Sequence, residues 1–175
     1  MAYAQMDAML EGDITRFKDA PVFTPFLWGE RCPGWDDARA GGFTGLKGHH
    51  GADSLYFAVL EGILFNLRQC YAILVDIGGA PKEIRVSGGI VNSGVLKRMA
   101  ADIMGRRLHI SPQSNASTVG GAAVALHMMG ILPTISQFPA ARGMPVEPDA
   151  RMCAFYEGRY TRYMEAYTHP GRVSG

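Results

Sequence analysis

The stretch Ile84–Leu96, IRVSGGIVNSGVL, joins an apolar run to an amphipathic segment through paired glycines. The apolar run before Gly88 predicts a strand, and the residues after Ser93 predict an amphipathic helix. A turn of this kind points the unpaired N–H groups and the dipole of a helix N-terminus at whatever lies beyond it. Phosphate binding is therefore the first interpretation to test.

Two standard nucleotide-binding motifs do not fit this turn. Gly89 and Gly94 match the first part of a P-loop, but Val95 and Leu96 stand where Lys and Ser/Thr should follow. The glycine spacing does not give G-x-G-x-x-G either. Spacing alone therefore leaves two interpretations about equally open, a tight turn that only reverses the chain and a nucleotide-binding turn.

Size and composition point to one soluble-type α/β domain. The chain has 175 residues, of which 47% are hydrophobic and 19% charged, with a formal net charge of +1. This balance gives no reason to expect nucleic acid or an anionic membrane as a partner. The 22 glycines are typical of a chain with many tight strand-to-helix turns. The apolar segment 55–75 contains Glu61, Asn66, Arg68 and Gln69, which favours a buried helix over a membrane span.

Three other groups of reactive side chains have structural interpretations. Cys32, Cys70 and Cys153 lie far apart without a C-x-x-C, so we expect buried free thiols in a reducing cytoplasm rather than disulfides or a zinc site. No signal peptide is visible, which also favours a cytoplasmic location. The pair His49–His50 lacks further ligands and is expected at the surface. The pair Asp36–Asp37 could serve as a base or metal ligand, but we favour a turn in which Asp side chains bond the backbone.

The remaining pattern alternates strands and helices. Strands are expected near 22–28, 42–46, 81–86 and 107–110. Helices are expected after Asp53 as N-cap, from Ser93 to Met104 with Gly105 as stop, from Asn115 or Ser117 to Gly130, and within 148–167. The last helix carries a packing stripe of Met152, Tyr156, Tyr160, Tyr163 and Tyr167. Residues 1–13 form a short helix with no evident partner, and 131–147 form a Pro-rich connection.

Several blocks, in this order, resemble the C-terminal domain of the FGGY carbohydrate kinases, most closely the gluconate kinase and xylulose kinase branch. The blocks are PFLWGERCPGWDDARAGGFTGL (25–46), AVLEGILFNLR (58–68), EIRVSGGIVNSGVLKRMAADIMGRRL (83–108) and SNASTVGGAAVAL (114–126), followed by the Tyr-rich helix. The resemblance covers roughly residues 22–167. It implies a lead-in segment at 1–21, the kinase C-terminal domain at 22–170 and a tail at 171–175.

The resemblance implies an α/β fold of the actin-like ATPase, ribonuclease-H-like type, with a mixed sheet flanked by helices. The chain would be the C-terminal half of a two-domain kinase that clamps ATP in its cleft and holds a sugar deeper between the domains. In that family the paired glycines pass under the adenosine, and a glycine and an amide one helical turn apart line the adenine and ribose pocket. The implied nucleotide-binding residues are Gly62, Asn66, Gly88, Gly89, Asn92 and Ser93.

The resemblance also implies what the complete enzyme does. It would transfer the γ-phosphoryl group of ATP, with Mg²⁺, to a hydroxyl of a sugar or sugar acid. In the family the catalytic aspartate and the phosphate-gripping loops come from sequence before PFLWGER, and no segment of this chain matches them. We therefore assign no catalytic or metal-binding residue, and expect this chain alone to be inactive without an N-terminal kinase domain as partner.

Two alternatives stay open at this point. The chain could be a non-catalytic module that forms a homodimer or binds a partner through surface that another domain would cover. It could also belong to another actin-like branch, such as the acetate kinase or hexokinase type, but the block PFLWGERCPGWD disfavours that interpretation.

Overall fold

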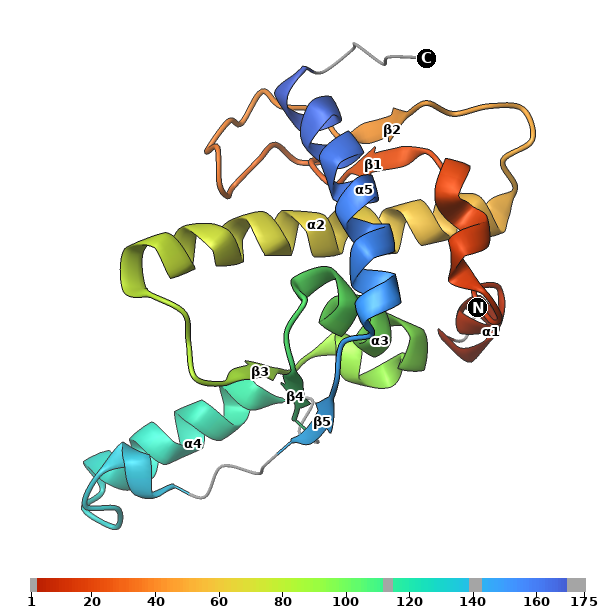
Figure 1. The fold of residues 1–175 in the computed structure, drawn as a ribbon. Helices are drawn as coiled ribbons and strands as arrows, with labels where there is room; N and C mark the ends of the chain where they lie inside the picture. The colour runs from red at the N-terminus through yellow and green to blue at the C-terminus, as the bar shows by residue number, and fades with distance from the viewer. Residues whose placement is uncertain (1–2, 112–114, 139–142, 170–175) are drawn as a thin grey trace.

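The computed structural model describes residues 3–111, 115–138 and 143–169, and it has two small sheets on either side of one long helix (Figure 1). The long helix is α2, Ala52–Gly78. Strands β1 (Val22–Thr24) and β2 (Gly42–Thr44) form an antiparallel pair that packs on α2. In the second sheet, β3 (Ile84–Val86) runs parallel to β4 (Leu108–Ile110), and β5 (Met144–Val146) runs antiparallel to β4. The fold is therefore α/β with a mixed sheet, as predicted.

The other elements are helical. They are α1 (Tyr3–Ala8), η1 (Ile14–Asp19), η2 (Gly89–Asn92), α3 (Gly94–Met104), α4 (Ala116–Met128), η3 (Ile135–Gln137) and α5 (Ala150–Thr168), where η denotes a 3₁₀-helix. Helix α5 packs against α3, α2 and β1, while α4 extends away from this group on the far side of the three-stranded sheet (Figure 1). The core therefore lies where α2, α3 and α5 meet.

The aromatic stripe on α5 packs into this core, which confirms the predicted role of its tyrosines. Tyr156 and Tyr163 are almost fully buried and lie against Phe57 and Phe65 of α2. Burying rings of this size contributes much of the apolar stabilisation of a domain.

A buried ion pair joins α2 and α5. Arg159 Nε and Nη2 donate hydrogen bonds to the two carboxylate oxygens of Glu61, each at 2.6 Å. The side chains of Glu61 and Arg159 are almost fully buried. The same guanidinium donates to the carbonyl oxygens of Lys18, Ala20 and Pro21. The buried charges are therefore paired and hydrogen-bonded. The bonds from Arg159 to the three carbonyl oxygens also hold the chain segment that leads into β1.

The segment before β1 is part of the core, contrary to the expectation that residues 1–13 have no partner. Leu10 is buried in the main hydrophobic cluster, and Phe17 stacks on Phe57. Asp7 of α1 accepts a hydrogen bond from the Ser93 hydroxyl, 2.8 Å away. The sequence pattern of a single short amphipathic turn was too brief to reveal this docking.

Helix α3 begins and ends as predicted. The Ser93 hydroxyl accepts a hydrogen bond from the backbone N–H of Leu96, and Gly105 ends the helix in the left-handed conformation at φ 59°. The N-cap of α2 differs from the prediction, since Gly51 takes that position and Asp53 lies in the first turn. The connection 131–147 also contains η3 and β5, which its prolines had concealed.

Helix α2 is long and apolar enough to cross a membrane by length and composition alone. Its middle section is buried against β1, α3 and α5 and carries the Glu61–Arg159 ion pair. These contacts are those of the core helix of a domain.

Candidate functional site

The paired glycines lie where β3 ends and the chain turns into η2 and α3. Gly88 has φ 89°, a conformation that favours glycine, and it stands at the N-cap position of η2. A Cβ atom added at Gly88 or Gly89 would meet no heavy atom within 4 Å. The turn therefore exposes bare backbone to open space, whereas a turn that only reversed the chain inside the core would be covered.

A shallow cavity of about 260 Å³ lies beside this turn, at the carboxyl ends of the two parallel strands. It is lined by Arg85, Val86, Ser87, His109, Ser111, Ala116, Val119, Gly120, Phe138 and Gly143. In open α/β sheets ligands bind outside the carboxyl ends of the strands. We call this cavity the strand-end cavity.

The first turns of α4 form one wall of the strand-end cavity. Asn115 occupies the N-cap position of α4 but makes no side-chain capping bond, and no acidic residue lies in the first turn. The Asn115 side chain therefore does not satisfy the first backbone N–H groups of α4. Gly120 and Gly121 have open space where a side chain would stand. The small residues of α4 are therefore not explained by a neighbouring backbone among the described residues.

The charged groups near this cavity are already paired. Arg85 donates to Glu83 through Nε and Nη2, at 3.0 and 3.2 Å, and this contact raises the pKa of Arg85. His109 Nδ1 lies 3.8 Å from Glu83. The cavity wall thus offers polar and small apolar groups for a neutral ring system, and little free positive charge for a chain of phosphates.

The space next to Gly62 is filled by protein, which corrects the interpretation that it leaves room for a nucleotide. A Cβ at Gly62 would lie 2.1 Å from the carbonyl oxygen of Phe23 in β1. Gly62 is buried, and glycine is required here because α2 and β1 approach so closely. A glycine in a helix pattern indicates close approach, but the sequence does not tell whether strand or ligand approaches.

Two other predicted nucleotide contacts have protein partners. The Asn66 amide donates to the carbonyl oxygen of Cys32 at 3.0 Å. The Ser93 hydroxyl caps α3 and donates to Asp7, and the residue is only 3% exposed. The predicted helix cap at Ser93 is confirmed, whereas a nucleotide contact by Ser93 stays a prediction.

The six predicted residues thus fall into two groups with different surroundings. Gly62 and Asn66 face β1 and the loop that follows it. Gly88, Gly89 and the exposed Asn92 belong to the turn between β3 and α3. Nucleotide contact by the turn residues stays a prediction.

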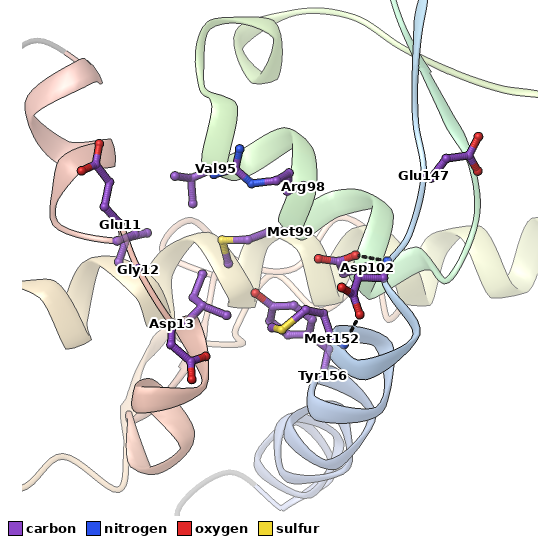
Figure 2. Close-up of a pocket in the computed structure, with 13 residues that line it drawn as sticks. Glu11, Gly12, Asp13, Val95, Arg98, Met99, Asp102, Glu147, Met152 and Tyr156 are labelled. Carbon is purple, nitrogen blue, oxygen red and sulfur yellow. Dashed lines mark hydrogen bonds between the residues drawn. The ribbon is translucent and has the colours of Figure 1, made fainter.

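A second cavity, of about 320 Å³, lies between the N-terminal segment, α3 and the start of α5 (Figure 2). The Asp102 carboxylate accepts a hydrogen bond from the backbone N–H of Asp149 at 2.8 Å, and Asp149 in turn caps α5 by accepting from Arg151 and Met152. Burial raises the pKa of Asp102. Asp102 and Asp149 thus join α3 to α5 at this cavity. None of the six predicted nucleotide-binding residues lines either cavity, although Ser87, next to Gly88, lines the strand-end cavity.

The loop after β1 contains a buried carboxylate that the sequence analysis did not single out. Glu30 is fully buried, accepts hydrogen bonds from Gly34 N and from the Tyr167 hydroxyl at 2.8 and 2.7 Å, and forms an ion pair with Arg39. These contacts fix the loop against α5, and burial together with Glu30 raises the pKa of Tyr167 to about 12. Because the charged Arg31 follows Glu30 directly, no local sequence pattern marks Glu30 as buried.

The adjacent aspartates of this loop form the predicted turn. Asp36 Oδ1 accepts from the backbone N–H of Ala38 at 3.0 Å, and Asp37 forms an exposed ion pair with Arg31. Over the described residues, no group of three or more His, Cys, Asp or Glu side chains could hold a metal ion.

Comparison with known proteins assigns this chain to a family. Residues 2–129 match the model of the C-terminal domain of the FGGY family of carbohydrate kinases. The chain belongs to the FGGY family. It is 31% identical over 147 residues to a probable L-xylulose kinase of Pasteurella multocida, covering 84% of this chain and 29% of that protein. It is 31% identical over 113 residues to a gluconokinase of Bacillus licheniformis, covering 64% of this chain and 22% of that protein.

Solved structures of FGGY kinases share the fold. The crystal structure of xylulose kinase from Rhodospirillum rubrum matches with a TM-score of 0.77 and 29% identity, over 95% of this chain and 33% of that chain. The crystal structure of Plasmodium falciparum glycerol kinase with ADP matches with a TM-score of 0.74 at 16% identity, over 98% and 34%. The chain therefore spans about a third of the length of the FGGY kinase structures that it matches.

Proposed function

We propose that this chain is the nucleotide-binding part of an ATP-dependent sugar or sugar-acid kinase. The observation that carries the proposal is the open backbone of Gly88 and Gly89 beside the strand-end cavity. Membership of a carbohydrate kinase family and the ADP in the related glycerol kinase structure support it.

The strand-end cavity suits the nucleoside part of ATP. Its walls combine small apolar residues, two serine side chains and the Phe138 ring with His109 and with Arg85, which is bound to Glu83, so a planar base could lie against bare backbone. The uncapped first turn of α4 adds backbone N–H donors near the same wall. In the proposed site Gly88, Gly89 and Asn92 contact the nucleoside, and Gly120 and Gly121 of α4 allow the base to approach from the other side.

The described residues do not suit Mg²⁺ or the transferring phosphate in the same way. The described residues contain no group of three or more His, Cys, Asp or Glu side chains that could hold a metal, and Arg85 is bound to Glu83. Phosphoryl transfer depends mainly on positioning, on charge neutralisation and on a carboxylate that orients the attacking hydroxyl. We therefore propose that this chain binds and orients the nucleoside, and that the rest of the kinase supplies the catalytic aspartate and the phosphate contacts.

A substitution at Gly89 tests the proposed site. Gly89→Leu adds a side chain where the protein leaves open space, so it should obstruct a ligand without disturbing the fold. Calorimetric titration with ADP should show that Gly89→Leu binds at least about tenfold more weakly than the wild type, which is a loss of about 1.4 kcal/mol or more in binding free energy. Gly48→Leu, at another glycine with open space around it, is the matched control and should bind ADP as the wild type does. Equal affinity of the wild type and Gly89→Leu would refute the site.

A binding or dimerisation module is the second candidate, and exposed apolar side chains on α2 favour it. Ile63, Leu67, Ile73, Leu74 and Ile77 are between 41% and 81% exposed. Apolar surface of this kind favours association. Sedimentation velocity distinguishes the candidates, because a self-associating module gives a dimer boundary that grows with concentration, whereas a nucleotide-binding part that only awaits another domain stays monomeric.

A further inference from the structure

Two thiols from distant parts of the chain lie in contact. The Sγ atoms of Cys32, in the loop between β1 and β2, and of Cys70, on α2, are 3.3 Å apart although the residues are 38 positions apart in sequence. Both are free thiols. A disulfide bond joins its sulfur atoms at about 2 Å, so a small side-chain movement separates this arrangement from a bonded one.

Neighbouring contacts hold the two thiols together. Asn66, one helical turn before Cys70, donates its amide to the carbonyl oxygen of Cys32. Glu30, two residues before Cys32, is buried and bonded to the Tyr167 hydroxyl. The loop is thus fixed to both α2 and α5, and the proximity of the thiols is built into the fold.

The two thiols differ in environment. Cys32 is exposed to solvent and can meet a reagent directly, whereas Cys70 is half-buried. Burial, followed by the hydrogen bond to Cys32, raises the pKa of the Cys70 thiol to about 11. Since the thiolate is the nucleophile, Cys70 reacts slowly with dissolved oxidants and is suited to a second, intramolecular step.

We propose that Cys32 and Cys70 form a redox pair that a low-molecular-weight disulfide, of the class of oxidised glutathione, converts into an intramolecular disulfide. The Cys32 thiolate attacks one glutathione sulfur, breaks the glutathione disulfide and releases one glutathione. The Cys70 thiolate then attacks the Cys32 sulfur, breaks the mixed disulfide and releases the second glutathione. The two protein thiols are oxidised, one glutathione disulfide is reduced to two thiols, and these carry away both protons.

The product would be a covalent tether between the loop after β1 and α2. It keeps the Asn66 amide on the Cys32 carbonyl and restricts the unfolded chain, which raises the melting temperature. The third cysteine provides an internal comparison, because Cys153 has no thiol near it among the residues described and can form only a mixed disulfide.

Peptide mapping of the full chain tests the proposal. The reduced protein is incubated with oxidised glutathione, alkylated, digested without reductant and analysed by mass spectrometry. We expect a peptide pair joined through Cys32 and Cys70 that has lost two hydrogen atoms, with Cys153 alkylated or carrying glutathione. The conversion of mixed disulfide to cross-link should accelerate about tenfold for each pH unit between about 7 and 9, because the fraction of Cys70 thiolate rises with pH in this range.

Two variants separate the steps. Cys70→Ser should accumulate glutathione on Cys32, since no second thiol can displace it, while the matched control Cys153→Ser should form the cross-link as the wild type does. A wild-type protein that ends with glutathione on Cys32 and a free Cys70, a cross-link through Cys153, or no reaction at Cys32 would each overturn the proposal.

Discussion

At the residue scale, the glycines of this chain serve two different purposes that look alike in sequence. At Gly62 the carbonyl oxygen of Phe23 occupies the space that a side chain would need, while at Gly88 and Gly89 that space is open. A strand backbone and a ligand both demand glycine, so a short motif predicts close approach without naming what approaches. Nucleotide contact by the six residues stays a prediction, and the structure explains Gly62 by packing and Ser93 by capping.

Substitution of Gly62 tests the packing explanation. Gly62→Ala places a methyl group 2.1 Å from the Phe23 carbonyl oxygen and should lower the free energy of unfolding by about 1–3 kcal/mol. Gly158→Ala, at an α5 glycine with open space around it, is the matched control. It should raise the stability by about 0.5–1 kcal/mol through helix propensity. Urea denaturation measures both, and a Gly62→Ala protein as stable as the wild type would contradict this explanation.

At the element scale, the sequence predicts elements best where capping chemistry is local. Ser93 and Gly105 bracket α3 because a hydroxyl N-cap and a left-handed glycine act within one turn. Strand β5 was missed because its three residues include Pro145 and its pairing with β4 is a long-range contact. The docking of Leu10 could not be predicted either, because a single buried side chain produces no periodic pattern in the sequence.

The junction of α3 and α5 predicts a dependence of stability on pH. Burial raises the pKa of Asp102 above its ordinary value of 3.8, so the folded state binds this proton more tightly than the unfolded state does. The resulting stabilisation is fully present below pH 3.8 and is lost as the pH rises through the raised folded pKa. The free energy of unfolding of the wild type, relative to that of Asp102→Asn, should therefore fall between acidic and neutral pH. Parallel urea titrations across this range measure the difference, and a constant or rising difference would disagree with the burial of this carboxylate.

At the scale of the whole molecule, the segment before β1 belongs to the same cooperative unit as the helices. Leu10, η1 and the Arg159 contacts to the carbonyl oxygens of Lys18 and Ala20 tie it to α2 and α5. Contacts between segments so far apart in the sequence cannot be predicted from local sequence patterns. The overall α/β class, by contrast, could be predicted because alternating apolar runs and glycine turns recur along the chain.

Leu10→Ala tests whether this segment contributes to stability. Loss of a buried leucine side chain should cost about 2–5 kcal/mol and lower the melting temperature accordingly. Leu74→Ala removes the same atoms from an exposed position on α2 and should change the stability by less than about 0.5 kcal/mol. Calorimetric melting of both proteins provides the comparison. A small effect at Leu10 would show that the segment detaches without cost.

The chain spans about a third of the length of its relatives, and phosphoryl transfer by the complete protein stays a proposal. We expect no turnover by the chain alone, since its described residues hold neither a metal cluster nor an unpaired cation in the strand-end cavity. ADP release is measured with ATP, Mg²⁺ and gluconate, xylulose, ribulose or glycerol. Sustained, sugar-dependent release by the chain would show that it holds a complete phosphoryl-transfer site.

We propose that the glycine turn after β3, together with α4, holds the nucleoside, and amide chemical-shift mapping during titration with ADP tests this binding site. We expect concentration-dependent shifts at Ser87, Gly88, Gly89, Asn92 and Gly120, with Gly62 and Cys32 unmoved. Shifts centred on Gly62 and the loop after β1, or an unchanged spectrum at millimolar ADP, would contradict it.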